Sequence, residues 1–313
     1  MSEDSANTAW GIGPGRTLPL DRPRVMTVLN VTPDSFSDGG RLTSPAVVVG
    51  AALRALEDGA DLLDVGGEST RPGAERVPVL EQIRRVVPAI EAIRAAGVGL
   101  PISVDTTRAE VARAALDAGA DIINDVAAGL EDEGVLALAA RRGCGLILMH
   151  RRLPPGEDSY SDAYASPPSD ADVVATVAGF LGDRLGAALA AGVAPEAVVL
   201  DPGLGFGKSV EQNLELIAGT PRLLALGRPV LSAASRKSFV GRASLGRDSE
   251  PGERLAGSLA VTAAHFQAGA RLFRVHDTRP HVEALRLLCG VHRASGAGRP
   301  GAGVERHGAG LGC

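Results

Sequence analysis

The chain has 313 residues, of which 45% are hydrophobic and only 3% aromatic, and its formal net charge at pH 7 is −5. This length fits one barrel-sized domain of about 250 residues with tails. The scarcity of aromatic residues and the lack of a long basic run disfavour a nucleic-acid-binding protein, which would need stacking platforms or many phosphate-binding cations.

Eight short apolar runs follow one another along the chain, and helix-patterned stretches separate them. Each run ends in a polar or ionisable residue; in chain order these are Asn30, Thr70, Asp105, Asn124, His150, Asp201, Lys237 and His276. Buried strands end in this way when their ends converge on something polar. The alternation is typical of a (β/α)8 TIM barrel, so we predict this α/β fold with its active site at the C-terminal rim of the strands.

The barrel is predicted to span residues 24–293 as a single catalytic domain. Residues 1–23, rich in Gly, Pro and polar residues, are predicted to form a flexible lead-in, and the Gly-rich residues 294–313 a disordered tail. Three strands are followed by long segments that would lie at the catalytic rim, where they could serve as lids. These segments are residues 31–44, 66–78 and 151–170.

Two of the segments that follow strands combine glycines with a cation. In residues 64–73, DVGGESTRPG, glycines and a proline frame Arg71, whose planar guanidinium suits recognition of a carboxylate or a phosphate. Residues 203–209, GLGFGKS, resemble a phosphate-binding loop, but that pattern needs a glycine where Pro202 stands. We therefore interpret the second segment as a tight turn that lets the backbone approach a ligand.

Asp105, Asn124 and Asp201 end three of the predicted strands. An Asp after a strand is most often a helix N-cap. However, the two threonines after Asp105 can cap the next helix, and Asp201 is followed by a proline and not by a helix. Two carboxylates and an amide at one rim could instead bind a ligand that presents an amidine-like edge of N–H donors.

Basic residues gather at the ends of the last two strands. Arg236 and Lys237 follow the seventh strand, and Arg274 and His276 occupy alternate positions of the eighth, so these two face the same side. The loops after strands seven and eight are a frequent phosphate site of this fold. Together with Arg71 across the rim, these four basic groups predict an anion pocket.

The cysteines and the ends of the chain bear on its location. Cys144, Cys289 and Cys313 lie far apart without a Cys-x-x-Cys pair, so neither a disulfide framework nor a zinc site is indicated. The first 24 residues lack the apolar segment of a signal peptide, and no run approaches the roughly 18 apolar residues of a membrane span. We therefore expect a cytoplasmic protein with no membrane or nucleic-acid partner.

From about residue 25 to residue 289 the chain resembles the dihydropteroate synthase family. Seven motifs in the same order carry the resemblance: VLNVTPDSFSDGG (28–40), DVGGESTRPGA (64–74), SVDT (103–106), NDV (124–126), LDPGLGFGK (200–208), SRKSF (235–239) and RVHD (274–277). The resemblance implies a (β/α)8 barrel and a transferase of folate biosynthesis that joins 4-aminobenzoate to 6-hydroxymethyl-7,8-dihydropterin diphosphate and releases diphosphate. It also implies Mg²⁺ as cofactor, a homodimer, and competition by sulfonamides at the aminobenzoate pocket.

The resemblance further implies roles for individual residues. Asp105, Lys237 and Arg274 would be catalytic. The pterin would be held by Asp105, Asn124, Met149, Asp201, Phe206 and Lys237. The diphosphate would be held by Asn30, Thr70, Arg71, Arg274 and His276, with Asn30 also near Mg²⁺. The aminobenzoate would lie between Thr70, Arg71, Pro72, Phe206, Lys237 and Ser238, while Asp34 and Phe36 arrive on the first loop as it closes.

Two other functions stay open. A pterin-binding methyltransferase domain shares the barrel, but it has no use for diphosphate-binding cations or for the STRPG and SRKSF segments. A non-catalytic paralogue would bind a pterin without turnover, and such relatives have altered residues in these segments, whereas this chain keeps Arg71, Pro72, Arg236, Lys237 and Ser238. The resemblance does not account for residues 151–170.

Overall fold

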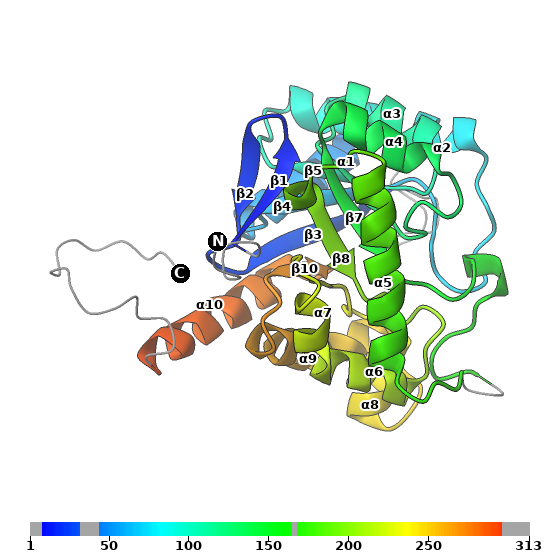
Figure 1. Cartoon of the computed structure of the whole chain (residues 1–313). Helices are drawn as coiled ribbons and strands as arrows, with labels where there is room; N and C mark the ends of the chain where they lie inside the picture. Colours follow the sequence, from blue (N-terminus) through cyan, green and yellow to red (C-terminus); the bar gives the residue numbers. More distant parts are fainter. Residues whose placement is uncertain (1–7, 32–43, 165–167, 296–313) are drawn as a thin grey trace, which may run out of the picture.

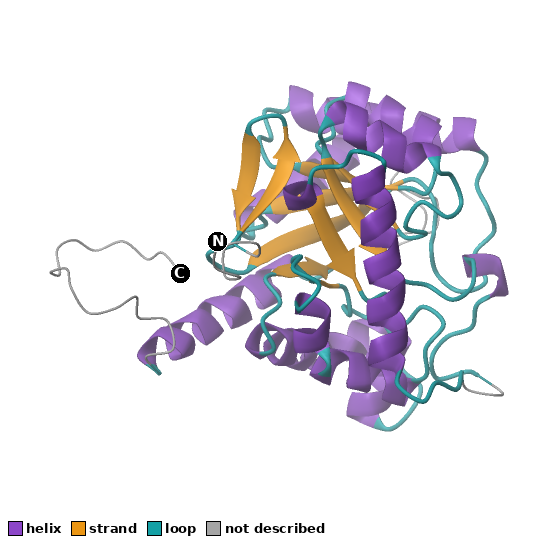
Figure 2. Ribbon diagram, viewed as in Figure 1, coloured by secondary structure: helices purple, strands orange, loops and turns teal. Residues whose placement is uncertain are grey.

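Eight parallel strands form a barrel inside a ring of helices in the computed structural model of the chain (Figures 1 and 2). The strand order is β8-β7-β6-β5-β4-β3-β10-β9. A bridge between Leu200 on β8 and Val230, next to β9, joins the first and last strands of this order and closes the barrel. The predicted (β/α)8 fold is thereby confirmed. The structure describes residues 8–31, 44–164 and 168–295, so Asp34, Phe36 and residues 296–313 of the predicted tail lie outside the described residues.

Each predicted apolar run contains one barrel strand, and the helices follow the strands in alternation. The strands are β3 (Arg24–Asn30), β4 (Leu62–Gly66), β5 (Ile102–Asp105), β6 (Ile122–Asp125), β7 (Gly145–Met149), β8 (Val198–Asp201), β9 (Leu231–Ser232) and β10 (Leu272–Val275). The helices are α1 (Pro45–Glu57), α2 (Val79–Ala95), α3 (Ala109–Asp117), α4 (Gly134–Arg142), α5 (Val173–Ala190), α6 (Val210–Ala218), α7 (Thr220–Leu224), α8 (Ser238–Leu245), α9 (Leu255–Gln267) and α10 (Thr278–Ala294).

Alternation along the strands divides the barrel interior into an apolar and a polar level. Since successive side chains of a strand point to opposite faces, residues two apart line the same interior. On β10, the fully buried Leu272 is followed two residues later by Arg274; on β8, the fully buried Val199 is followed by Asp201. The apolar level lies near the strand starts and the polar level near their C-terminal ends, as the polar strand ends predicted.

The predicted flexible lead-in is wrong for residues 8–23. Strands β1 (Ala9–Gly13) and β2 (Arg16–Pro19) pair as an antiparallel hairpin, which packs against one end of the barrel (Figure 1). Trp10 is fully buried and donates from its indole Nε1 to the carbonyl of Ala197 at 2.8 Å. The hairpin side chains form one apolar cluster with the lower barrel level: Trp10, Ile12, Leu18 and Leu20 contact Met26, Leu62, Ile122, Ile147, Val199, Leu231 and Leu272.

The hairpin gains its order from burial and not from local propensity. Its apolar side chains alternate along the chain, which is a strand signal that the surrounding glycines and prolines obscured. Gly145 at the start of β7 shows how closely the hairpin approaches, because a Cβ there would lie 3.2 Å from Trp10 Cζ2 and 3.3 Å from the Gly11 carbonyl oxygen. The hairpin therefore closes the barrel at the end opposite the polar level.

Helix α5 is, within the part of the chain that the structure describes, the one helix long and apolar enough to cross a membrane by length and composition. It packs against β7, α4, α6 and α7 in the outer layer of the barrel. Its Arg184 donates to the carbonyl oxygen of Ala128 at 2.8 Å. These contacts are those of a helix that covers a barrel.

We predict that Trp10→Ala lowers the free energy of unfolding by about 3–5 kcal/mol, the usual cost of removing a large buried aromatic side chain. The side chain is fully buried over the lower barrel level. Urea denaturation followed by circular dichroism measures the loss, and Trp10→Phe, which keeps much of the packing, should lose less. A loss below about 1 kcal/mol in Trp10→Ala would mean that the hairpin contributes little to the barrel.

Candidate active site

The side chain of Arg274 lies at the centre of the polar level. From β10, its Nε donates to Asp64 Oδ2 on β4 at 2.6 Å, and its Nη2 donates to Asp105 Oδ2 on β5 at 2.9 Å. Burial alone would lower the pKa of Arg274, but the charges of Asp64 and Asp105 outweigh it and raise this pKa above its ordinary value. The guanidinium therefore stays charged and holds the ends of three strands in register.

Asp64 is a site residue that the sequence analysis missed. Its side chain is fully buried and accepts from Arg274 and, at 3.3 Å, from the Nδ2 group of Asn124. The signal in the sequence was an ionisable residue inside the apolar run LLDVG, at the position that faces the interior. A buried carboxylate of this kind needs a charged partner, and Arg274 is that partner.

Asp105 and Asn124 each leave one oxygen without a partner. Asp105 Oδ1 and Asn124 Oδ1 are buried and accept no hydrogen bond from residues 8–31, 44–164 or 168–295. Burial raises the pKa of Asp105 to about 7, and the charges of Asp64 and Glu68 add to the rise while Arg274 opposes it. Because unpaired buried acceptors are costly, the two oxygens indicate a ligand that brings N–H donors.

Asp201 ends β8, and Lys237 follows β9 near enough for the two charges to interact. Asp201 Oδ1 accepts from the backbone N–H of Gly203 at 2.7 Å, and burial raises the pKa of this carboxyl. Lys237 donates to the carbonyl of Leu204, and its Nζ lies 4.4 Å from the centre of the Phe206 ring. Desolvation lowers the pKa of Lys237 to about 8, against the opposing charge of Asp201, so the side chain is an ammonium at pH 7. Met149 pairs in register with Asp201 and is buried beside it.

The Gly-rich loop after β8 is a tight turn, as predicted, and its lysine is not free to bind phosphate. Gly203 has a φ of +64°, and a Cβ at this position would lie 1.8 Å from the carbonyl oxygen of His150. The fully buried Lys208 donates to the carbonyls of Gly203 and Phe206, each at 2.8 Å. Its Nζ therefore holds the loop together from inside, and Phe206 extends from this turn.

The four basic groups predicted at this part of the rim differ in their charges and in their partners. Arg236 pairs with Asp277, Nε to Oδ2 at 2.8 Å, and so its charge is already matched. Burial and the charge of Arg274 lower the pKa of His276 to about 3, so His276 is neutral at pH 7, and its Nδ1 lies 3.3 Å from the Oγ of Ser235. Arg274 is likewise paired with Asp64 and Asp105, so of the four groups Lys237 is the cation that forms no ion pair with a carboxylate of the described residues. Ser238 is buried at the start of α8, directly after Lys237.

Asn30 ends β3 beside the polar level. A Cβ on Gly66, its register partner on β4, would lie 3.3 Å from Asn30 Oδ1 and 3.5 Å from Asp105 Cβ. The missing side chain at Gly66 thus leaves space for the Asn30 amide next to Asp105. Among the residues that the structure describes, no group of three or more His, Cys, Asp or Glu side chains is placed to hold a metal ion.

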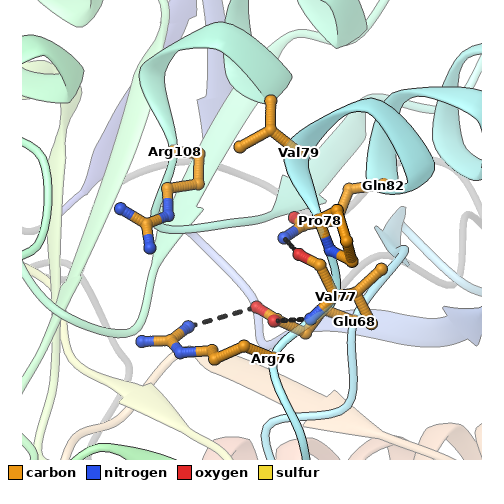
Figure 3. Close-up of a pocket in the computed structure, with 7 residues that line it drawn as sticks. All are labelled: Glu68, Arg76, Val77, Pro78, Val79, Gln82 and Arg108. Atoms are coloured by element: carbon orange, nitrogen blue, oxygen red, sulfur yellow. Dashed lines mark hydrogen bonds and ion pairs between the residues drawn. The ribbon is translucent and has the colours of Figure 1, made fainter.

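Thr70, Arg71 and Pro72 lie on the segment between β4 and α2. Glu68, near the start of this segment, binds two residues near its end. Glu68 accepts from the backbone N–H of Val77 at 2.7 Å and from Arg76 Nη1 at 3.2 Å (Figure 3). A cleft of about 280 Å³ lies next to these contacts. It is lined by Glu68, Arg76, Val77, Pro78, Val79, Gln82 and Arg108 (Figure 3). None of the predicted site residues lines the cleft, so it is separate from the polar level of the barrel.

Comparison with known proteins agrees with this geometry. A model of the pterin binding enzyme family matches residues 26–276. A dihydropteroate synthase of Synechocystis sp. is 42% identical over 270 residues, which cover 86% of this chain and 89% of that relative. The solved structure of Xanthomonas albilineans dihydropteroate synthase with 4-aminobenzoic acid aligns with a TM-score of 0.81 at 48% identity and covers 91% of this chain and 98% of that one. The Xanthomonas albilineans enzyme in complex with 7,8-dihydropteroate aligns with a TM-score of 0.76 at 46% identity and covers 89% of this chain and 97% of that one.

We predict that the stability of Asp105→Asn relative to the wild type increases between about pH 4 and about pH 7. Burial raises the pKa of Asp105 from 3.8 to about 7. In this interval the unfolded wild-type chain releases a proton that the folded protein retains, so the wild type loses at most about 1.4 kcal/mol per pH unit, whereas the amide does not titrate. Urea denaturation of both proteins at several pH values measures the difference, and a difference that does not vary with pH would contradict the raised pKa.

Proposed function

We propose that this chain, which belongs to the pterin binding enzyme family and within it to the dihydropteroate synthases, condenses 6-hydroxymethyl-7,8-dihydropterin diphosphate with 4-aminobenzoate. The products are 7,8-dihydropteroate and diphosphate, and the pathway is folate biosynthesis. The observation that supports this most directly is the pair of buried, unpaired oxygens on Asp105 and Asn124 at the same rim as Asp201. They fit a heterocycle whose edge carries several N–H donors.

The pterin would lie on the polar level of the barrel. Its 2-amino group and N3–H form two parallel donors, which a carboxylate accepts in a strong charge-assisted contact, and Asp201 is the carboxylate we assign to them. Asp105 Oδ1 and Asn124 Oδ1 would accept from the remaining N–H donors of the pterin, which are the ring N8–H and the second hydrogen of the 2-amino group. Met149 beside Asp201, and Phe206 beneath Lys237, supply apolar surface for the faces of the ring.

The chemical step breaks the bond between the pterin methylene carbon and the diphosphate oxygen, and the electron pair leaves with diphosphate. The arylamine nitrogen, which is neutral at pH 7, forms the new bond to this carbon and then loses a proton. Negative charge accumulates on the leaving group, where preorganised donors stabilise it. Lys237 and Arg274 are the charged donors of this part of the rim, the neutral His276 is a further donor, and Arg71 and Thr70 lie on the segment after β4.

The carbon that loses diphosphate becomes cation-like as its bond breaks. The carboxylates of Asp105 and Asp201 would stabilise this charge electrostatically. The aminobenzoate would approach from the outer side of the rim, between Thr70, Arg71, Pro72, Phe206, Lys237 and Ser238. This division places the pterin on the strands and the aminobenzoate on the loops.

Mg²⁺ is part of the proposal, and the residues present fit it. Mg²⁺ binds through one or two protein oxygens together with substrate phosphates, and it does not need a full protein cage. The Asn30 Oδ1 atom occupies the space left by Gly66 at the rim, which gives one such oxygen. When bound with the substrate, the ion would offset the charge of the diphosphate. A homodimer and a cytoplasmic location also belong to the proposal, and light scattering tests the dimer.

Formation of dihydropteroate by the purified protein tests the proposed function. With the pterin diphosphate, 4-aminobenzoate and Mg²⁺, we expect diphosphate release that depends on 4-aminobenzoate and stops when the metal is chelated. Pterin binding without turnover would favour the non-catalytic paralogue. Release that does not require 4-aminobenzoate, or no pterin binding at all, would refute the assignment.

We predict that Lys237→Ala loses most activity and keeps its fold. Removing one preorganised donor from a developing negative charge typically costs about 2.7–4 kcal/mol, or roughly 10²–10³-fold in kcat. Lys237 makes one hydrogen bond to a carbonyl and one ring contact, so its loss leaves the barrel intact. Steady-state kinetics measure the change, and thermal unfolding serves as the control. Turnover at the wild-type rate would show that Lys237 does not act on the leaving group.

A further inference from the structure

Residues 151–164, which follow β7, connect the two rim segments to which the proposed function assigns the aminobenzoate. On one side they contact the segment after β4: the carbonyl of Pro155 accepts from the backbone N–H of Gly73 at 2.8 Å. Arg151 adds an ion pair with Glu131, which also pairs with Arg76 at the end of that same segment. The position of Thr70, Arg71 and Pro72 is therefore tied to the start of residues 151–164.

On the other side these residues contact the Gly-rich loop after β8 through Asp158. This carboxylate is 8% exposed, and its Oδ2 accepts from the backbone N–H of Gly207 at 2.9 Å. Its Oδ1 accepts from the N–H of Ser159 at 2.8 Å and from the hydroxyl of Tyr164, so the side chain has one orientation. The contact is close, because a Cβ on Gly207 would lie 2.6 Å from Arg152 Cβ.

These contacts fix Phe206 from both of its neighbours. Gly205 donates its N–H to Asn213 Oδ1 at 2.6 Å, and Gly207 donates its N–H to Asp158. The ring between them lies 4.4 Å from the ammonium of Lys237. The charge of Asp158 also opposes the burial that lowers the pKa of Lys208, whose Nζ holds the same loop from inside. Without Asp158 the loop would lose an anchor on the side that faces residues 151–158.

We propose that Asp158 is a positioning residue for the arylamine substrate. It holds Phe206 in place, and the turn Pro155–Glu157 that precedes it links Phe206 to the segment bearing Thr70, Arg71 and Pro72. The two walls of the aminobenzoate pocket thus keep a fixed separation. The residues assigned to the pterin lie on strands or at their ends: Asp105, Asn124 and Asp201. Among the described residues, none of these three forms a hydrogen bond with Asp158.

The inference rests on the proposed function and predicts a selective kinetic effect. In Asp158→Ala we expect the KM for 4-aminobenzoate to rise about tenfold, since a small misplacement of binding groups has effects of this size or larger. The KM for the pterin diphosphate should rise less, by no more than about threefold, because Phe206 is the pterin contact that Asp158 holds, and the strands that carry the acceptors of the ring are untouched. Asp158→Asn keeps an acceptor for Gly207 and should lie between Asp158→Ala and the wild type.

Asp162 offers a matched control in the same segment. It forms no hydrogen bond or ion pair with the described residues, so Asp162→Ala and Asp162→Asn should behave like the wild type. If Asp158→Ala does not fold, Asp158→Asn against Asp162→Asn makes the same measurement, with an expected rise of about threefold in the KM for 4-aminobenzoate and a smaller change in the KM for the pterin diphosphate.

Each outcome has a definite meaning. A rise in the KM for 4-aminobenzoate that clearly exceeds the change in the KM for the pterin diphosphate supports the positioning role. Equal changes in both KM values, or an Asp158 variant that matches its Asp162 control, would overturn this role while leaving the proposed function in place. Failure of the wild-type protein to form dihydropteroate would refute the proposed function, and the inference with it.

Discussion

The site depends on one buried guanidinium. Arg274 reaches from β10 to carboxylates on β4 and β5, so the same contacts that hold three strand ends together also place the acceptors of the polar level. Burying Asp64 and Asp105 would be costly without this cation, since an isolated buried carboxylate loses its hydration. Arg274 takes one oxygen of Asp105 and leaves the other unpaired. One oxygen of the Asp105 carboxyl group therefore contributes to stability, and the other is available to bind a ligand.

The two lysines of the chain show how tertiary contacts separate structural from chemical roles. Lys208 is fully buried, and its Nζ donates to backbone carbonyls of the loop it supports. Lys237 is partly exposed and has one carbonyl and the face of Phe206 as partners. Lys208 rigidifies the turn that carries Phe206, and Lys237 lies over the ring with donor capacity to spare. The rim thus combines the charged Lys237 with the Phe206 ring on its fixed loop, and residues 151–164 connect this loop to the segment after β4.

The errors of the sequence analysis share a physical origin. Arg236 and His276 count as cations in the sequence, but Asp277 forms an ion pair with the first, and burial beside Arg274 keeps the second uncharged. Asp64 escaped notice because it lies inside an apolar run and not at its end. The hairpin was missed because its alternation is short and interrupted by glycines. Each case depends on which side chains meet across the barrel, which adjacent residues in the chain do not specify.

The sequence by itself determined the barrel, the rim on which the polar strand ends gather, and most of the residues at that rim. Strand periodicity and the directionality of parallel strands suffice for this, because every strand of such a barrel ends on the same side. Only the tertiary structure decided which charges are already matched, which oxygens are left unpaired, and that residues 151–164 connect two rim segments. Those outcomes follow from distances between residues far apart in the chain and from the cost of desolvating charge, and neither is encoded in local sequence.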